Sequence, residues 1–347
     1  MGLFSILPGL RNALADPDIA IDLGTANTRL YAQGKGLIAD EPSLVRFDTE
    51  TGSVEAIGKR AAKLAVASTD EHARDVAPLR AGVIADVDAA ASLLTPLLRR
   101  ARFLGIVRPR VLACAPTDAR EEEREAIVEA VRRAGAASVQ LAPEPLAAAI
   151  GAGLDVSSPY AQMLVDVGHG VTDIAVISSG ALITSSALRT ACSDMHAAVR
   201  RAILDSHGTM LYSQEAERLT REVGVVSGDG SATSLSALGS DPDTGREVRI
   251  VVSSREIARA IDPVATTIVN AVRNSVRDLP ETLSCEVIES GICLTGGGAH
   301  LPGFADLIAR ETSLDVRPAA DPLRAVINGA RQMLAVGALT SLWTLRA

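Results

Sequence analysis

An aspartate followed two residues later by a glycine occurs twice in similar surroundings. The stretch from Ile19 to Tyr31 can be laid on the stretch from Met163 to Ala175 with a constant offset of 144 residues. The positions that coincide are Asp22 with Asp166, Gly24 with Gly168, and Thr28 with Thr172. In both copies an apolar run reaches the aspartate and glycine and then resumes as alternating apolar residues, which predicts a β-hairpin. The chain is therefore expected to contain two similar halves, each opening with a hairpin whose tip carries Asp-x-Gly.

Two such turns have the chemistry to bind a polyphosphate. Glycine permits a tight turn whose backbone N–H groups approach phosphate oxygens closely, here in residues 24–27 and 168–170. The carboxylates of Asp22 and Asp166 could hold a hydrated Mg²⁺. A third glycine turn, residues 296–298, follows an apolar strand and offers a flat backbone surface for a purine or a ribose. The alternative is that the hairpins are ordinary products of a duplication and bind no ligand.

The segments around the hairpins alternate between helical and strand patterns, which is typical of an α/β protein. The predicted helices are Glu121–Ala134, Pro145–Gly153, Asp194–His207, Gln214–Val223 and one that begins at a Ser254 N-cap and runs toward Asp278. The predicted strands are Val111–Ala115, Val139–Leu141 and Gly291–Thr295. Residues 227–245 are rich in Gly, Ser and Asp and are expected to form an exposed loop or hairpin tip. Pro302 suits the first turn of the helix that follows the third glycine turn.

Composition narrows the class of protein. At 347 residues the chain is long enough for about two domains, and a 47% hydrophobic content with only 4 Phe, 3 Tyr and 1 Trp predicts an aliphatic core. The net charge of −8 argues against nucleic-acid binding. The 4 cysteines form no C-x-x-C pair, which favours reduced, buried thiols over a metal site. No apolar run is long enough to cross a bilayer.

A basic patch with an apolar centre lies within residues 99–110, where no acidic residue occurs. Its arginines are Arg99, Arg100, Arg102, Arg108 and Arg110, and they flank the apolar residues Phe103, Leu104, Ile106 and Val107. Such a patch attracts an anionic membrane surface while the apolar tip inserts. The alternative is that the apolar residues finish a helix and pack inward. The N-terminal leucines, spaced at helical intervals from Leu3 to Leu14, are open to two similar interpretations: a tail packed on the body, or a short helix on the membrane surface.

Four ordered motifs resemble those of the MreB/Mbl bacterial actin family. They are DLGTANT at residues 22–28, EPLAAAIGAG at 144–153, DVGHGVTD at 166–173 and LTGGGA at 294–299. They look like the family's phosphate-1, connect-1, phosphate-2 and adenosine motifs, and the match spans nearly the whole chain. The resemblance implies an actin-like α/β fold with two duplicated, ribonuclease-H-like lobes and Mg-ATP in the cleft between them.

The resemblance also implies a domain layout, a set of site residues and a function. The N-terminal lobe would be residues 1–150 with an insertion near 35–80, and the C-terminal lobe residues 151–347 with an insertion near 186–254 and a last helix that returns to the N-terminal lobe. The residues expected at ATP are Asp22, Gly24, Thr25, Ala26, Asn27, Asp166, Gly168, His169, Gly170, Glu217, Thr220, Gly296, Gly297, Gly298 and Ala299, with Asp22 and Asp166 holding Mg²⁺ through water. The protein would be cytoplasmic and would assemble with itself into filaments on the inner face of the cell membrane. There it would organise cell-wall synthesis together with elongation proteins.

Several positions depart from the family's pattern. Pro143 stands where the family usually has the first of two glutamates, so the side chain that would position the attacking water is missing. Glu144, the one catalytic candidate, is expected to aim elsewhere. In the second phosphate motif His169 replaces a bare glycine, and it either donates to phosphate or marks a relaxed site. Val171 in the same motif lacks the hydroxyl that the family has there. Outside the motif, Thr220 stands where the family has a lysine near the adenosine. These changes imply at most a slow ATPase. The alternatives are a non-hydrolysing scaffold of the same fold, or a sugar or acetate kinase.

Overall fold

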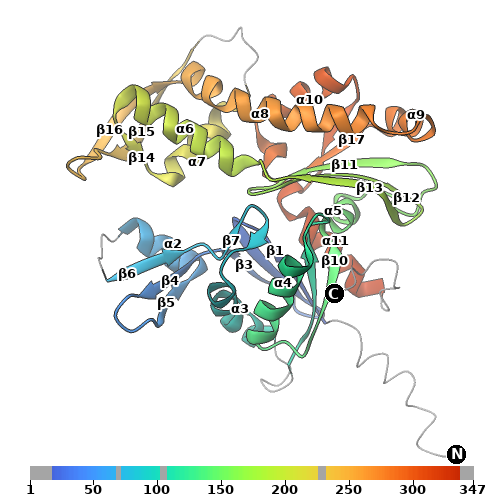
Figure 1. Ribbon diagram of the computed structural model, residues 1–347, viewed down its shortest axis with the longest axis horizontal. Helices are drawn as coiled ribbons and strands as arrows, with labels where there is room; N and C mark the ends of the chain where they lie inside the picture. Colours follow the sequence, from blue (N-terminus) through green and yellow to red (C-terminus); the bar gives the residue numbers. More distant parts are fainter. Residues whose placement is uncertain (1–17, 68–71, 102–107, 226–231, 337–347) are drawn as a thin grey trace, which may run out of the picture. The chain divides into compact units, whose positions relative to one another are not determined.

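The computed structural model describes residues 18–67, 72–101, 108–225 and 232–336. These residues divide into two compact units, and Figure 1 shows the elements of both. Unit 1 holds the described residues up to Ser157, together with Ser179–Leu182 and the described residues from Arg324 onward. Unit 2 holds Ser158–Ser178 and Ile183–Leu323.

Unit 1 is built around a five-stranded sheet with the order β10-β9-β1-β2-β3. Its strands are β1 (Ile19–Leu23), β2 (Asn27–Ala32), β3 (Gly36–Pro42), β4 (Val45–Asp48), β5 (Val54–Ile57), β6 (Ala73–Val76), β7 (Leu79–Arg80), β8 (Val83–Ile84), β9 (Arg110–Ala115) and β10 (Ser138–Pro143). Its helices are α2 (Gly58–Ala67), α3 (Val87–Ala101), α4 (Glu121–Arg133), α5 (Glu144–Ala152) and α11 (Ala325–Val336). The central strand β1 is buried at every position, as expected for a strand that is covered on both faces.

Unit 2 contains a second five-stranded sheet, with the order β13-β12-β11-β17-β18. Its strands are β11 (Gln162–Val167), β12 (Thr172–Ser178), β13 (Ala181–Leu188), β14 (Met210–Leu211), β15 (Ser234–Ser240), β16 (Glu247–Ser253), β17 (Ile292–Thr295) and β18 (Val316–Pro318). Its helices are α6 (Cys192–His207), α7 (Ser213–Val223), α8 (Ser254–Arg277), α9 (Glu281–Ser290), α10 (Phe304–Thr312) and the short 3₁₀ helix η2 (Gly297–His300), and η3 (Pro322–Arg324) leads from unit 2 to unit 1.

The two large sheets repeat one topology. In each sheet, the first strand of an antiparallel hairpin also pairs with a parallel strand, and a second parallel strand lies beyond that one. The order is β2-β1-β9-β10 in unit 1 and β12-β11-β17-β18 in unit 2. Equivalent residues also keep the same register, because Leu23 pairs with Thr28 and Val167 with Thr172. Both predicted hairpins are therefore confirmed, and the sequence repeat corresponds to a repeated sheet.

Each unit has an aliphatic core, as the composition predicts. The core of unit 1 packs α3 and α4 against the sheet through side chains such as Leu94, Leu98 and Val131. The core of unit 2 joins α6, α8 and α10 through Val199, Ile261 and residues of similar type. Among the described residues, no helix combines the length and apolarity needed to span a membrane.

A smaller sheet accompanies each large one, and the sequence missed part of the second. In unit 1 the order is β5-β4-β6, with the buried Arg46 pairing with Glu55 and Asp75 at 3.1 and 2.9 Å. In unit 2 the order is β14-β15-β16. The predicted loop over residues 227–245 is wrong for Ser234–Ser240, which forms β15 and pairs along its whole length with β16.

Two helix starts also differ from the predictions. The N-cap of α8 is Ser253 rather than Ser254, since the Ser253 hydroxyl accepts the N–H of Arg255. Pro302 lies before the first turn of α10, whose N-cap is Gly303 with φ +75°. A glycine suits that left-handed conformation better than any residue with a Cβ atom.

Helix α11 packs on α5 in unit 1 at two glycines. A Cβ atom added at Gly151 of α5 would lie 1.8 Å from the carbonyl oxygen of Ala325, and one added at Gly329 of α11 would lie 1.8 Å from that of Ala147. The two helix backbones are therefore in direct contact, which only glycine allows.

The predicted membrane residues lie outside the described part of the chain. This applies to Phe103, Leu104, Ile106, Val107 and the N-terminal leucines. Of the flanking arginines, Arg99, Arg100 and Arg108 are exposed. Arg110 instead holds Asp18, with its main-chain N–H donating to that carboxylate at 2.7 Å and its Nη2 lying 3.6 Å away. Arg110 is therefore paired with an acidic residue, contrary to what the sequence pattern alone would indicate.

Candidate functional site

The glycine turn of unit 1 joins β1 to β2 directly beyond Asp22. The N–H of Gly24 donates to the carbonyl of Asn27 at 3.1 Å, and a Cβ atom on Gly24 would lie 2.7 Å from that oxygen, so the turn requires glycine. Ser43 stabilises the turn through two hydrogen bonds. Its hydroxyl donates to the Gly24 carbonyl at 2.7 Å, and its main-chain N–H donates to the Ala26 carbonyl at 2.9 Å. No signal in the sequence pointed to Ser43.

The tip of this turn presents main-chain donors. The N–H groups of Thr25 and Ala26 make no hydrogen bond to any described residue, whereas the carbonyls of Gly24 and Ala26 are occupied. The Thr25 hydroxyl accepts the N–H of Gly82 at 3.0 Å, which ties the tip to the β7–β8 turn. A turn of this kind, with its N–H groups outward, is suited to an anion.

Asp22 is buried at the base of the turn, with 4% of its surface exposed. Burial raises the pKa of its carboxyl, and the Arg29 guanidinium, 3.1 Å away, offsets part of this effect. Arg29 is shared with Asp40, which also pairs with Arg324 at 3.3 Å. Asp22 is therefore an oxygen donor whose position is fixed by its neighbours.

Three further groups lie near the end of β1. Cys114 is buried at the end of β9, and the pKa of its thiol is raised well above the ordinary value by burial and by the carboxylates of Asp22 and Glu144. Glu144 is the first residue of α5 and follows the buried N-cap Pro143. Because both carboxylates act on one thiol, Glu144 lies at the same sheet edge as Asp22.

The glycine turn of unit 2 repeats this geometry. The N–H of Gly168 donates to the carbonyl of Val171 at 2.9 Å, and a Cβ atom on Gly168 would lie 2.9 Å from that oxygen. The carbonyls of Gly168 and His169 accept the N–H groups of Cys192 and Ser193, at 3.2 and 2.8 Å, in the first turn of α6. The N–H groups of His169 and Gly170 make no hydrogen bond to any described residue, so this tip is also a pair of free donors.

Asp166 occupies the position equivalent to Asp22, with 6% of its surface exposed. It lies beside Thr295 of β17 in the parallel register, and a Cβ atom on Gly296 would be 2.4 Å from its Oδ1. Gly298 is equally close to Val167, where a Cβ atom would lie 2.5 Å from the valine Cβ. The third glycine turn therefore packs directly on the strand that ends in Asp166.

Thr295 is a site residue that the sequence did not single out. Its side chain is fully buried, and its hydroxyl makes no hydrogen bond to the described residues. A buried polar atom of this kind is normally satisfied by a partner. A bound water beside the Asp166 carboxylate would satisfy this one, which fits a hydrated Mg²⁺ at that position.

Helix α7 supplies the remaining predicted residues, and it places them on different faces. Thr220 is fully buried, and its hydroxyl donates to the Ala216 carbonyl at 2.8 Å, so it offers no polar atom to a ligand. Glu217 is accessible and pairs with Arg221 at 3.5 Å. Of these two residues, only Glu217 presents a polar group that a ligand could reach.

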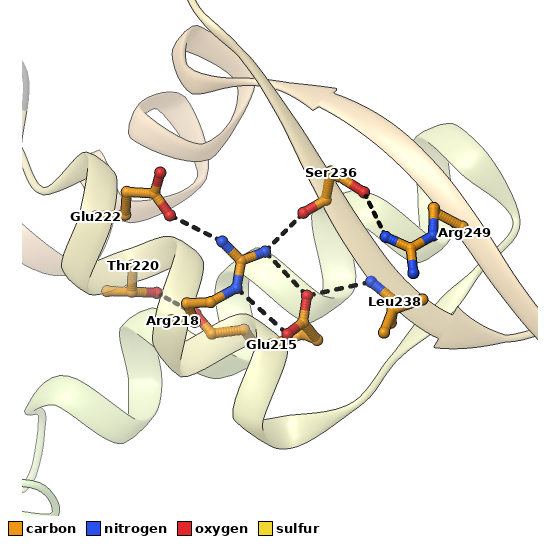
Figure 2. Close-up of polar contacts among 8 residues, drawn as sticks. Glu215, Arg218, Thr220, Glu222, Ser236, Leu238 and Arg249 are labelled. Carbon is orange, nitrogen blue, oxygen red and sulfur yellow. Dashed lines mark hydrogen bonds and ion pairs between the residues drawn. The ribbon is translucent and has the colours of Figure 1, made fainter.

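A network along α7 fixes the helix to the small sheet (Figure 2). Arg218 donates to both carboxylate oxygens of Glu215, at 3.2 and 2.9 Å, to Glu222 at 2.8 Å and to the Ser236 carbonyl at 2.6 Å. Glu215 in turn accepts the N–H of Leu238 at 3.2 Å. Arg218 lowers the pKa of the Glu215 carboxyl through these hydrogen bonds. The direction of α7, and with it the position of Glu217, therefore depends on β15.

A shallow hollow of about 620 Å³ lies along α7 within unit 2. Its lining comprises Gln214, Glu217, Arg218, Arg221, Glu222 and His300. The helical residues recur every three or four positions and so form one face. His300 ends the 3₁₀ turn that begins at Gly297, so the hollow adjoins the third glycine turn. The size of the hollow, its polar side chains and the imidazole ring of His300 suit a nucleoside.

Two imidazoles meet beside the turn of unit 2. The ring centroids of His169 and His196 are 5.5 Å apart, with the ring planes inclined by 50°. His196 lies on α6, and the sequence gave no reason to connect it with His169. The structure thus brings together, within unit 2, the turn at Gly168, the carboxylate of Asp166, the α7 face and this pair of histidines.

Comparisons with known proteins identify the family of the chain. The model of the family described as MreB/Mbl protein matches residues 16–340. The chain is 36% identical over 318 residues to the cell shape-determining protein Mbl of Bacillus subtilis (strain 168), covering 91% of this chain and 95% of that protein. It is 35% identical over 323 residues to the cell shape-determining protein MreB of Escherichia coli (strain K12), covering 91% and 93%.

A solved structure shows the same fold. The crystal structure of MreB 5 of Spiroplasma citri bound to AMPPNP superimposes with a TM-score of 0.85 at 30% identity, covering 93% of this chain and 97% of that one. The repeated sheets and their glycine turns are thus those of the actin-like fold, and the chain belongs to the MreB/Mbl family.

Proposed function

We propose that this protein binds Mg-ATP and assembles into filaments that lie on the inner face of the cell membrane and organise cell-wall synthesis. The observation that carries the nucleotide part is the pair of equivalent turns. Each has a buried aspartate at the end of its first strand, a glycine that closes the turn and two free N–H groups at the tip. One such turn would be a common structural feature, but two at equivalent positions of repeated sheets fit a ligand with several phosphates.

Each set of residues has a role in this proposal. The N–H groups of Thr25, Ala26, His169 and Gly170 bind phosphate oxygens, and Gly24 and Gly168 give the turns their shape. Asn27 orients the first turn through its carbonyl. Asp22 and Asp166 hold the hydrated Mg²⁺, which would neutralise phosphate charge when bound. Gly296, Gly297, Gly298 and Ala299 support the nucleoside beside Glu217.

Related structures support nucleotide binding. The MreB 5 structures of Spiroplasma citri are described as bound to AMPPNP and to ADP. The Mbl and MreB relatives are named cell shape-determining proteins, which supports a role in cell shape for this chain. Self-assembly into filaments and contact with wall-synthesis and elongation proteins are the corresponding proposals for partners.

The first experiment tests the nucleotide site. Calorimetric titration of the full chain with Mg-ATP should show binding, and Asp22→Asn should weaken it by about tenfold or more because a charged ligand is lost from a buried position. Asp155→Asn is the matched control, since Asp155 is exposed and caps only a surface turn. Equal affinities for wild type and Asp22→Asn would remove Asp22 from the site.

The second experiment tests the membrane surface. Phe103→Ser with Leu104→Ser should release the protein from anionic liposomes, and added salt should do so in part by screening the arginines. Leu37→Ser with Val54→Ser is the control, because these are exposed apolar residues elsewhere in unit 1. Equal co-sedimentation of wild type and the Phe103/Leu104 variant would contradict the proposal.

We further propose that hydrolysis is slow. Positioning water in line with a terminal phosphate needs a carboxylate or amide, and its loss commonly costs about 10²-fold in rate. Pro143 has neither, and it is buried as the N-cap of α5. Phosphate release at saturating Mg-ATP, above the polymerisation threshold, should rise in Pro143→Glu. A wild-type rate equal to that of the variant would show that another residue, such as Glu144 or His169, positions the water.

A non-hydrolysing scaffold is the alternative that the substitutions at Pro143 and His169 favour. Sedimentation with and without Mg-ATP separates the two. Nucleotide-dependent pelleting supports the ATP-binding filament, whereas pelleting that ignores nucleotide, with no binding heat, supports the scaffold.

A further inference from the structure

The pair formed by His169 and His196 has features that the structure of the turn does not require. The chain has 5 histidines, and two of them meet here from segments 27 positions apart, with ring centroids at 5.5 Å. The main chain of His169 is fixed by the hydrogen bond that its carbonyl accepts from the Ser193 N–H at 2.8 Å. Neither ring makes a hydrogen bond to a residue in the described part of the chain, so both rings have free nitrogen atoms.

Charged groups surround the pair from three elements. Glu217 and Arg221 face it from α7 and Asp194 from α6, while Asp166 lies at the end of β11 close to Cys192, the first residue of α6. Burial lowers the pKa of His169, although Glu217 and Asp194 oppose this. Burial, together with His169 and Arg221, lowers the pKa of His196 to about 4. Both rings are therefore neutral at pH 7.

A bound polyphosphate would change the charge balance at this pair. The proposed site uses the N–H groups of His169 and Gly170 as phosphate donors, so a phosphate there lies next to the His169 ring. An anion within a few ångströms favours the protonated form of an imidazole. Arg221 already carries its positive charge and is paired with Glu217 at 3.5 Å, so of the nitrogen bases at this place only the imidazoles can gain a positive charge near neutral pH.

We propose that binding of a nucleoside polyphosphate is coupled to uptake of one proton by this pair, with His169 contacting phosphate and His196 acting as its positioning residue. The proton comes from solvent and adds to a ring nitrogen of His169, and no covalent bond to the nucleotide forms or breaks. Because His196 stays neutral, it does not repel the protonated His169 ring beside it. Its own ring keeps His169 directed toward the turn. This inference rests on the proposed nucleotide site and adds a pH dependence to it.

The expected consequence is an affinity that rises as pH falls. Between the pKa of His169 in the free protein and its pKa in the complex, the bound state carries more protons, so the affinity increases by up to about tenfold for each pH unit of acidification. Below the free-state pKa the gain stops. Acid also protonates the nucleotide itself, so the measurement needs a variant that lacks the imidazole but binds the same ligand.

Calorimetry with Mg-ADP and Mg-AMPPNP, from pH 5.5 to 8 and in buffers of different ionisation enthalpy, measures both affinity and proton uptake. Wild type should take up between about 0.5 and 1 proton more than His169→Gln near pH 6.5 and should show the steeper pH profile. His196→Gln should keep nucleotide binding but lose part of this excess. His207→Gln, at the other end of α6, is the matched control and should behave as wild type.

Ring resonances give a second readout that a purely structural role would not move. In the spectrum of the histidine side chains, the pKa of His169 should rise when Mg-ADP is added, and this rise should shrink in His196→Gln. Equal proton uptake by wild type and His169→Gln, with nucleotide still bound, would overturn the inference alone. Absence of binding heat at every pH would overturn the proposed nucleotide site as well. Unchanged uptake in His196→Gln would overturn the role of His196.

Discussion

The contact between α5 and α11 gives a prediction whose sign tests the structure. Gly329→Ala places a methyl group 1.8 Å from the Ala147 carbonyl oxygen, which has to move to at least 3.4 Å for ordinary contact. The oxygen belongs to the backbone of α5 and the methyl group is fixed directly to the backbone of α11, so no side chain can rotate away and the helices themselves must separate. Overpacking of this kind costs about 3 kcal/mol, at the upper end of its usual range. Alanine returns about 1 kcal/mol through its better helix propensity.

The net expectation is a loss of about 2 kcal/mol in the free energy of unfolding. Urea denaturation followed by circular dichroism should show a lower midpoint for Gly329→Ala and for Gly151→Ala. The double variant should lose less than the sum of the two, because the second methyl enters helices that have already separated. Ala197→Gly, at an exposed position inside α6, measures the propensity effect alone and should cost about 1 kcal/mol.

Propensity and packing predict opposite signs for Gly329→Ala. If the helices were not in contact at this glycine, the substitution would stabilise the protein by about 1 kcal/mol. A midpoint at or above that of wild type would therefore refute the close approach.

Further measurements follow from particular side chains. Exposed Cys285 should react with a disulfide reagent at mildly alkaline pH, whereas the buried Cys114 and Cys192 should react only on unfolding. Burial raises the pKa of both buried thiols, to about 12 for Cys192. Rapid labelling of Cys114 or Cys192 in the folded protein would contradict their burial. Arg218→Ala should cost about 1–3 kcal/mol in urea denaturation, because it leaves carboxylates and a carbonyl without their donor, and Arg218→Lys should recover only part. Burial lowers the pKa of His196 from 6.5 to about 4, so below pH 6.5 the folded protein binds fewer protons than the unfolded chain. The neutral His196 ring therefore contributes at most about 3 kcal/mol to the free energy of unfolding above pH 6.5, and this contribution is lost as pH falls toward 4. His196→Gln should flatten that acid limb, and an unchanged profile would contradict the assignment.

The hairpins and helices could be predicted because their signals are local. Alternating apolar residues around Asp22 and Asp166 specify the strands, and the charged and apolar faces of Glu121–Ala134 specify α4. β15 was missed because its Ser- and Gly-rich sequence is typical of a loop. Its strand conformation comes from seven pairings with β16 and from Gly239, which lets the backbone approach Met210 closely.

The sequence predicted the two glycine turns of the candidate site, but it did not predict which side chains meet beside them. Spacing identified Gly24 and Gly168 because a repeated pattern constrains both at once. Spacing could not connect His169 with His196, because their contact depends on how α6 starts beneath the turn. The family resemblance also placed Thr220 at the ligand, whereas its side chain is fully buried and its hydroxyl donates to the Ala216 carbonyl.

The position of α11 in the chain has a consequence for synthesis. This helix belongs to unit 1 but is encoded after all of unit 2, and it covers α5 and contacts β1. The Asp18–Ser157 segment therefore emerges from the ribosome long before α11, and the face of α5 that packs on α11, which includes Ala147 and Gly151, lacks this partner during that interval. Translation through about residue 336 must precede final folding of the first unit. Partly folded chains with exposed apolar surface are prone to aggregation, so a fragment ending at Ser157 is expected to aggregate more readily than the full chain.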